Sequence, residues 1–335
     1  MANVLVTSSA AGETFDPWKH STEFLLKHSA ELDAFGQHKL TDDPEAADII
    51  VFGEMGTCGK FAERVRAHAY YKRFPDKCFL FDSSDMIWPV VPGIYASLKK
   101  EHYQADQTVG GFYLYVIENA FITHRPLTGT EKYLASFVGS KNTAAVREKL
   151  FELNREDVLV RDTSSYSWLT NYHGQPPDRA RVWSDYADCI ADARFSLCPR
   201  GKGAASIRLF ESMKMGRACV ILADEWQRNE DVDWDSFSIT VREEDALKIP
   251  EILEKYVDRA REMGESARAE WEKWFSEKVR FHRVAEWCLS LQERRRRQGR
   301  MRRYSSIRHM INPSNFRRYL SSKRDLYRQT GKIYW

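Results

Sequence analysis

The most informative stretch of the sequence is Phe195-Ser-Leu-Cys-Pro-Arg-Gly-Lys-Gly-Ala-Ala-Ser-Ile-Arg-Leu-Phe-Glu-Ser-Met-Lys-Met-Gly-Arg-Ala-Cys-Val-Ile-Leu222. Residues 194–198 are mainly apolar and predict a strand, and residues 199–205 predict a loop. Residues 206–215 have the apolar spacing of a helix, and a second strand is predicted over 218–222. Strand, helix and strand in succession indicate a parallel sheet covered by helices.

The predicted loop has the composition of an anion site. Gly201 lets the backbone approach a ligand closely, and Arg200 and Lys202 place two cations beside it. The helix begins near Ser206, so its free N–H groups and positive dipole end point into the loop. These three features together suit a diphosphate.

Two side chains of the following helix extend this interpretation. Arg208 lies in the first turn, and Glu211 lies three residues later on the same face. A carboxylate at that place can accept hydrogen bonds from ribose hydroxyls, so the segment indicates a nucleotide-diphosphate site. The alternative is an ordinary surface ion pair beside plain turn glycines, because the loop is neither a P-loop nor a G-x-G-x-x-G motif.

Alternating strands and helices continue on both sides of this segment. Strands are predicted at 4–6, 48–52, 77–81, 134–138, 157–160 and 237–241, and helices at 22–32, 60–71, 142–153, 181–191 and within 250–297. Residues 95–130 predict irregular structure. The pattern indicates an α/β chain with two Rossmann-like halves facing each other across a cleft, with ligands beyond the carboxyl ends of the strands. The expected domains are 1–130, 131–290 and a basic tail over 291–335.

Phe195–Leu222 resembles the signature of the exostosin-like glycosyltransferases, which reads F-x-L-x-P-R-G, S-x-R-x-x-E, G and V-I. The likeness continues at Val232-Asp-Trp-Asp-Ser-Phe-Ser-Ile-Thr-Val241, where the family has D-W-x-x-F-S. Ser136-Phe-Val-Gly-Ser140, with Arg147, resembles the family's F-x-G strand, and Asp82-Ser-Ser-Asp85 resembles a weaker N-terminal feature. The resemblance covers about residues 134 to 255.

The resemblance implies a GT-B fold and inverting transfer of a sugar from a nucleotide sugar, usually UDP-linked, without a bound metal or other cofactor. Arg200 and Arg208 would hold the diphosphate, and Glu211 would bind the ribose. The full set of expected donor contacts is Gly139, Ser140, Arg200, Gly201, Lys202, Ser206, Arg208 and Glu211. The chain departs from the family after Gly216, where Arg217-Ala-Cys-Val replaces C-x-P-V.

Inverting transfer also needs a base for the acceptor hydroxyl, which we expect in the N-terminal half. Glu54 follows a predicted strand directly and is a candidate base. Asp82 and Asp85 follow the next strand and are candidate acceptor-side residues, and His124 is a fourth candidate. The alternative for each is a solvated or loop-capping residue.

Two other functions remain open. Asp231 and Asp233 have the D-x-D spacing with which metal-dependent transferases hold a divalent cation on the diphosphate. The chain could also be a non-catalytic module that binds polyanions or glycans on a transferase scaffold. If the chain is a transferase, the predicted acceptor is a saccharide or a lipid-linked saccharide.

Charge is distributed unevenly along the 335 residues. The segment from Leu291 to Trp335 contains 12 Arg and 2 Lys but only one Glu and one Asp, so its net charge is +12. Since the whole chain has a net charge of +3, the preceding residues carry −9. Aromatic residues, among them Tyr304 and Phe316, are interleaved with the arginines. Such a tail could bind an anionic membrane surface, pack on the acidic body or, less in keeping with the rest, bind nucleic acid.

The remaining composition indicates a reduced, cytoplasmic setting, with peripheral membrane association through the tail. The six cysteines form no C-x-x-C pair, so neither a disulfide framework nor a zinc site is expected. No apolar run approaches the length of a membrane span, and the first residues lack the basic n-region of a secretory signal.

Overall fold

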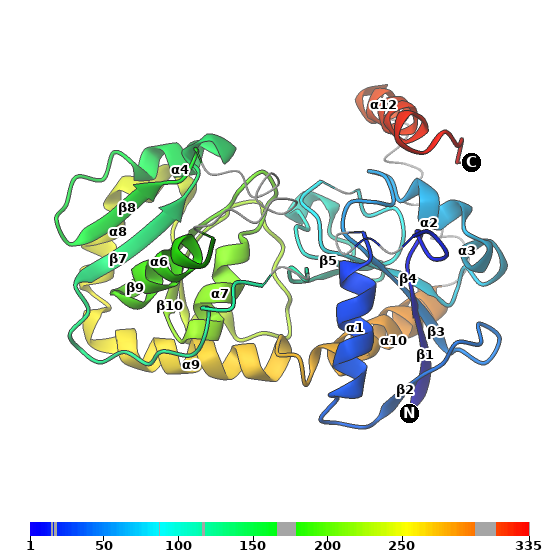
Figure 1. Ribbon diagram of the computed structural model, residues 1–335, viewed down its shortest axis with the longest axis horizontal. Helices are drawn as coiled ribbons and strands as arrows, with labels where there is room; N and C mark the ends of the chain where they lie inside the picture. The colour runs from blue at the N-terminus through cyan, green and yellow to red at the C-terminus, as the bar shows by residue number, and fades with distance from the viewer. Residues whose placement is uncertain are drawn as a thin grey trace. The chain divides into compact units, whose positions relative to one another are not determined.

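A computed structural model describes the chain except for residues 15, 17, 18, 87, 116, 117, 166–178, 299–312 and 335 (Figure 1). The chain divides into two compact units. Unit 1 contains Met1–Val116, Trp226–Asn229 and Ser276–Trp335, and unit 2 contains Ile117–Glu225 and Glu230–Phe275. Among the described residues, no helix combines the length and apolar character needed to cross a bilayer.

Unit 1 is built on a parallel sheet in the order β2-β1-β3-β4-β5-β6. The strands are β1 (Ala2–Thr7), β2 (His38–Leu40), β3 (Ile49–Glu54), β4 (Cys78–Asp82), β5 (Gly93–Tyr95) and β6 (Thr108–Gly110). Every residue of β3 and β4 is buried, as expected for central strands covered on both faces. The helices are α1 (Ser21–Glu31), α2 (Glu63–Ala67), α3 (Ala69–Arg73), the 3-10 turn η1 (Lys100–His102), α10 (Arg280–Gln298) and α12 (Pro313–Thr330).

Two segments distant in sequence complete unit 1. Helix α10 packs on α1, β3 and β5, and the Gln292 amide donates to the backbone oxygens of Asp48 and Asp76. The fully buried Trp226 donates from its indole to the backbone oxygen of Ala96 at 3.2 Å. The expected boundary at residue 290 therefore differs from the observed grouping, because the apolar face of α10 is buried in unit 1.

Unit 2 is built on a second parallel sheet in the order β11-β10-β9-β7-β8. Its strands are β7 (Tyr133–Gly139), β8 (Val158–Asp162), β9 (Ala193–Pro199), β10 (Ala218–Leu222) and β11 (Ser238–Thr240). Its α-helices are α4 (Ala145–Leu150), α6 (Arg179–Ala191), α7 (Ile207–Met215), α8 (Ile249–Glu254) and α9 (Ala260–Trp274). Its 3-10 turns are η2 (Lys141–Thr143), η3 (Trp234–Ser236), η4 (Glu243–Lys248) and η5 (Val257–Arg259).

The predicted α/β class with two parallel sheets is confirmed, and the differences are local. The helix predicted over 60–71 is broken at His68, which has an extended backbone and whose side chain caps α3 by accepting from the Tyr70 amide. The segment 95–130, predicted as irregular, contains β6 and its 3-10 turn. Strands β2, β5 and β6 have three residues each, too few to show a periodicity in the sequence. All six cysteines are free and buried.

The tail helix α12 packs on unit 1 along one face. Leu326 is buried, and the Lys60 amide donates to the buried Ser322 hydroxyl at 3.2 Å. Phe316 and Leu320 of the same helix are exposed. Packing on the body, one of the three alternatives for the tail, therefore holds for α12, while Tyr304 and Trp335 lie outside the described residues.

Candidate functional site: a nucleotide-diphosphate site in unit 2

The residues predicted to bind a diphosphate gather where the strand order of unit 2 reverses. From β7 the chain passes to β8 on one side, and the later strands β9, β10 and β11 lie on the other side. The loops after β7 and β9 therefore diverge from a shared edge. In doubly wound parallel sheets this is where ligands bind, beyond the carboxyl ends of the strands.

Arg208 lies between the ends of β7 and β9, where the strand order reverses. It is buried, with 6% exposure, and its guanidinium donates to the backbone oxygen of Val138 in β7. The guanidinium carbon also lies 4.6 Å from the Phe137 ring centroid and 5.5 Å from that of Tyr186. Its Nε is buried without a hydrogen-bond partner. An arginine held in this way is not the ordinary surface ion pair that the sequence also allowed.

Gly139 ends β7 directly beside this guanidinium. A Cβ atom at this position would lie 2.9 Å from Nη2 of Arg208 and 3.0 Å from the Phe137 ring. Any larger residue would thus displace the arginine. The backbone at Gly139 thus comes closest to the arginine that is predicted to hold the diphosphate.

The loop after β9 is held in shape by Arg147 from α4. Its Nε donates to the backbone oxygen of Arg200 at 2.8 Å, and its Nη2 to that of Pro199 at 3.3 Å. Arg200 itself directs its Nε to Glu243 at 2.7 Å. The cation expected to contact the diphosphate is therefore paired with a carboxylate from η4.

Glu211 is partly buried and faces a tyrosine. Its Oε2 accepts a hydrogen bond from the Tyr186 hydroxyl at 2.5 Å. Burial raises the pKa of Glu211, while the Tyr186 hydrogen bond and the charge of Arg208 oppose that rise. Tyr186, Arg208 and Glu211 thus form one polar group on α6 and α7, in which the carboxylate keeps acceptor capacity for a sugar hydroxyl.

The other residues predicted to contact the donor differ in their exposure and in the hydrogen bonds that they already make. The Ser206 hydroxyl is buried without a hydrogen-bond partner and does not cap α7. Lys202 is exposed and Gly201 partly exposed. Ser140 accepts from the Asn142 amide at 3.4 Å and lies 3.2 Å from the Ser164 hydroxyl, so its side chain serves the loop after β7.

Unit 1 places two of the predicted carboxylates side by side at its own strand ends. Glu54 in β3 and Asp82 in β4 are register partners, and both are fully buried. Glu54 accepts from the Ser9 amide, which follows β1, and from the Thr57 hydroxyl at 2.6 Å. It therefore ties together the loops where the strand order of unit 1 reverses.

Burial sets the protonation of this pair. The pKa of Asp82 is raised to about 7, chiefly by burial; hydrogen bonds from Ser84 oppose the rise, and the charges of Glu54 and Asp85 add to it. Burial also raises the pKa of Glu54, against its hydrogen bonds to Thr57 and Ser9. The Asp82 carboxyl can therefore exchange a proton near neutral pH.

The two remaining candidate bases lie elsewhere. Asp85 is exposed and accepts from the Tyr113 hydroxyl at 2.6 Å, so its carboxylate can meet a solute directly. His124 belongs to unit 2 and lies against Gly216, just before β10 begins. That is the amino edge of the sheet, so His124 lies at the edge opposite the loop after β9.

The same geometry accounts for Arg217, the departure from the family pattern. It is buried before β10 and donates to the backbone oxygens of Ile190 and Ala191, at the end of α6. The substitution therefore changes the amino edge of the sheet and leaves the loop after β9 untouched.

Asp231 and Asp233 are exposed on either side of the buried Val232, in the turn leading to η3. Trp234 of η3 is buried and packs against Phe237 and Phe275. The segment thus has an evident packing role. Neither aspartate belongs to a group of three potential metal ligands within the described part of the chain.

Residues 115–256 match the family model of the Exostosin GT47 domain. "Exostosin-1 homolog" of Caenorhabditis elegans is 32% identical over 151 residues, which is 41% of this chain and 39% of that protein. "Exostosin-1" of Drosophila melanogaster is 27% identical over 165 residues, which is 45% of this chain and 22% of that protein. Over this segment, which is less than half of the chain, the protein is similar to the exostosin glycosyltransferases. It spans well under two thirds of the length of these relatives.

Two solved structures are similar to the chain at low identity. TarM has a TM-score of 0.41 and 10% identity, with 81% of this chain and 58% of TarM covered. MurG of Acinetobacter baumannii has a TM-score of 0.38 and 8% identity, with 86% of this chain and 99% of MurG covered.

Some residues of this group are absent from the contacts that the sequence predicts: Phe137, Tyr186 and Glu243. Arg147 enters only through the resemblance to the family. Tyr186 precedes Glu211 by a whole strand and loop, so no local spacing links the two residues. The sequence offers one indication of the role of Arg147, because this cation lies in the predicted helix that follows the F-x-G strand.

Proposed function

We propose that the chain is a glycosyltransferase that binds a UDP-linked sugar in unit 2 and transfers the sugar to a hydroxyl of a saccharide or lipid-linked saccharide. The observation that carries the proposal is the buried Arg208, with Ser206 beside it. Both bring unpartnered buried polar atoms to the point where the strand order reverses. A diphosphate supplies the acceptors that these atoms lack.

In this proposal each residue has a defined task. Arg208 and the positive end of α7 neutralise the charge that develops on the departing diphosphate. Arg200 joins them when the diphosphate competes with Glu243 for its guanidinium. Glu211 accepts a ribose hydroxyl, and Gly139 leaves the space that the phosphates need. Because cations of the chain supply the charge, the proposed transfer needs no divalent metal. Inversion is the part of the proposal that comes from the resemblance to the family.

The acceptor hydroxyl needs a base, and the carboxylates of unit 1 are our candidates. Asp85 is exposed and can contact an acceptor directly, whereas the fully buried Glu54 and Asp82 would have to act through movement of their loops. We therefore assign the base to Asp85 and the ordering of the loops to Glu54. In an assay, Asp85→Asn should lower kcat with little change in the donor KM.

The donor site is tested by a thermal-shift screen of UDP, GDP, CMP and TDP. UDP should stabilise the protein with rising concentration, and Arg208→Gln should weaken UDP binding by roughly ten- to hundredfold, the value of a charge-assisted contact. Arg242→Gln is the matched control, because Arg242 is an exposed arginine of unit 2 paired with Glu244 at 2.9 Å. Equal loss in both variants would contradict the assignment.

Turnover separates the enzyme from its alternatives. A panel of UDP-sugars and saccharide acceptors should yield product without added Mg²⁺ or Mn²⁺, and Asp233→Asn should keep that activity. Dependence on an added cation, lost in Asp233→Asn, would favour the metal-dependent transferase. Nucleotide binding without any transfer or hydrolysis would favour the binding module.

The exposed face of α12 supports a second part of the proposal, peripheral binding to an anionic membrane at the cytoplasmic face. Phe316 and Leu320 are about half exposed and lie one turn apart, with Arg317 and Arg324 on the same helix. Flotation with anionic vesicles should retain the full chain, and Leu320→Glu should release it. Binding unchanged by Leu320→Glu and by truncation after residue 298 would exclude this role.

A further inference from the structure

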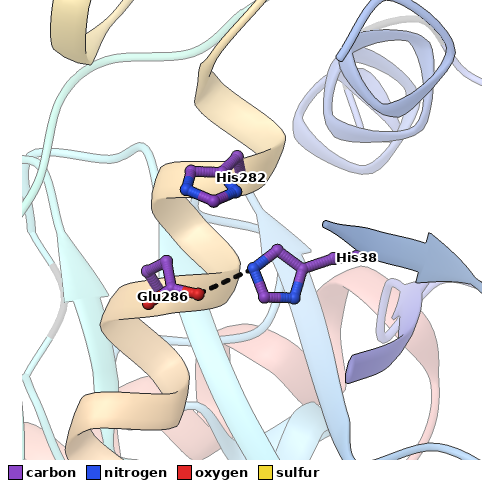
Figure 2. Close-up of side chains that lie close together, drawn as sticks. All are labelled: His38, His282 and Glu286. Atoms are coloured by element: carbon purple, nitrogen blue, oxygen red, sulfur yellow. Dashed lines mark ion pairs between the residues drawn. The ribbon is translucent and has the colours of Figure 1, made fainter. Parts of the chain in front are cut away.

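Three potential metal ligands lie together in unit 1, apart from the carboxylates at its strand ends. His38 begins β2, the edge strand of the sheet, and His282 and Glu286 lie one turn apart on α10 (Figure 2). One ligand atom from each lies within 4.8 Å of the others. Among the residues that the structure describes, no other group of three or more His, Cys, Asp or Glu side chains has its ligand atoms this close together.

Both histidines are buried and incompletely partnered. They are 7% and 5% exposed, respectively. Nδ1 and Nε2 of His38 and Nδ1 of His282 have no hydrogen-bond partner, although His38 Nε2 lies 2.8 Å from Oε1 of Glu286. That contact is an ion pair, marked by the dashed line in Figure 2. Buried ring nitrogens ordinarily make hydrogen bonds, so this set needs an explanation, and a bound cation would satisfy it.

The surroundings fit an ion with one open coordination position. Phe35 stacks on His282 with ring centroids 3.9 Å apart and shields that ligand from solvent. The Glu286 side chain is 49% exposed, which leaves a path for the ion and for a water ligand. Asp33, which interacts electrostatically with His282, has a buried carboxylate oxygen without a partner. It can orient an imidazole N–H or balance the charge of the ion.

We propose that His38, His282 and Glu286 bind a zinc ion that joins the edge strand β2 to α10. Two imidazole nitrogens and one carboxylate oxygen are a ligand set that zinc accepts when a fourth position is left to water. The ion would fasten a helix from the end of the chain to a strand near its start, and so stabilise unit 1. This departs from the expectation from sequence that the chain holds no metal, and it is independent of the donor site.

The test begins with metal content. Full-length protein without a histidine tag is treated with chelator, dialysed and titrated with Zn²⁺ against a competing chelator. We expect one tightly bound equivalent. Glu286→Gln should weaken the affinity at least tenfold, and His282→Gln should weaken it further. Glu286 is half exposed, so its variant should fold. His28→Gln is the matched control, because His28 is a more exposed histidine of unit 1 in contact with Glu31 at 3.1 Å.

Two further readouts separate coordination from a structural effect. Bound Co²⁺ should give d–d absorption in the parent and in His28→Gln, and this absorption should be altered or lost in Glu286→Gln. Zn²⁺ at ~100 times its Kd should raise the melting temperature of the parent by roughly 5 °C, with a smaller rise at the same Zn²⁺ concentration in Glu286→Gln. Zn²⁺ binding that both ligand variants leave intact, or no bound equivalent in the parent, would overturn the proposal.

Discussion

Replacing Asp82 by asparagine would remove a carboxyl group that is fully buried at the end of β4. Asparagine has nearly the shape of the protonated aspartic acid and keeps an oxygen for the Ser84 hydroxyl, which lies 2.9 Å from Oδ2. The substitution therefore compares the parent protein with a permanently neutral side chain. Any difference in stability should appear only at pH values at which Asp82 is ionised in the unfolded parent chain.

The sign of the effect follows from the pKa of Asp82. Burial raises it from 3.8 to about 7, so between about pH 4 and pH 7 the folded protein holds a proton that the unfolded chain has released. The free energy of unfolding of the parent therefore falls as the pH rises through this window and stays lower above it. Asp82→Asn should be free of this loss.

The magnitude follows from the same two values. A rise from 3.8 to about 7 corresponds to about 4 kcal/mol, since each pKa unit is worth about 1.4 kcal/mol. We expect Asp82→Asn to match the parent near pH 4 and to be more stable by an amount on the order of 4 kcal/mol near pH 8. The negative charge of Glu54 contributes part of this difference.

Urea unfolding should be followed by hydrogen exchange of the β3 and β4 peptides, because this reports on unit 1 within a two-unit chain. Asp85→Asn is the matched control, since it removes an exposed carboxylate three residues away and should not reproduce the gain. A gain that is the same at both pH values, or a variant less stable than the parent near pH 8, would refute the reasoning.

Three further predictions concern packing. Gly139→Ala places a Cβ 2.9 Å from Nη2 of Arg208 and should weaken UDP binding by about tenfold in calorimetry; unchanged affinity would mean that the arginine does not contact the nucleotide. Tyr186→Phe removes the hydroxyl that donates to Glu211 and should cost about 1–3 kcal/mol in urea unfolding of unit 2, whereas a neutral result would show that water replaces the donor. Trp226→Ala should destabilise unit 1 by about 3–5 kcal/mol in the same assay, and a loss confined to unit 2 would contradict its placement.

Part of the candidate site could be predicted because its residues are close together in sequence. Arg200, Gly201, Ser206 and Arg208 lie within one loop and one helical turn, where composition alone indicates an anion site. The structure adds the partners of these residues. Glu243, which pairs with Arg200, comes from a separate turn, and no spacing rule connects the two.

The sequence by itself determined the two parallel sheets, because buried parallel strands are continuous apolar runs and the helices between them carry a regular apolar spacing. Only the tertiary structure decided the order of the strands, and with it the meeting of Gly139 and Arg208. It also decided that α10 belongs to unit 1 and brings His282 to His38. Local patterns record which face of an element is buried, but they do not record which distant element covers that face.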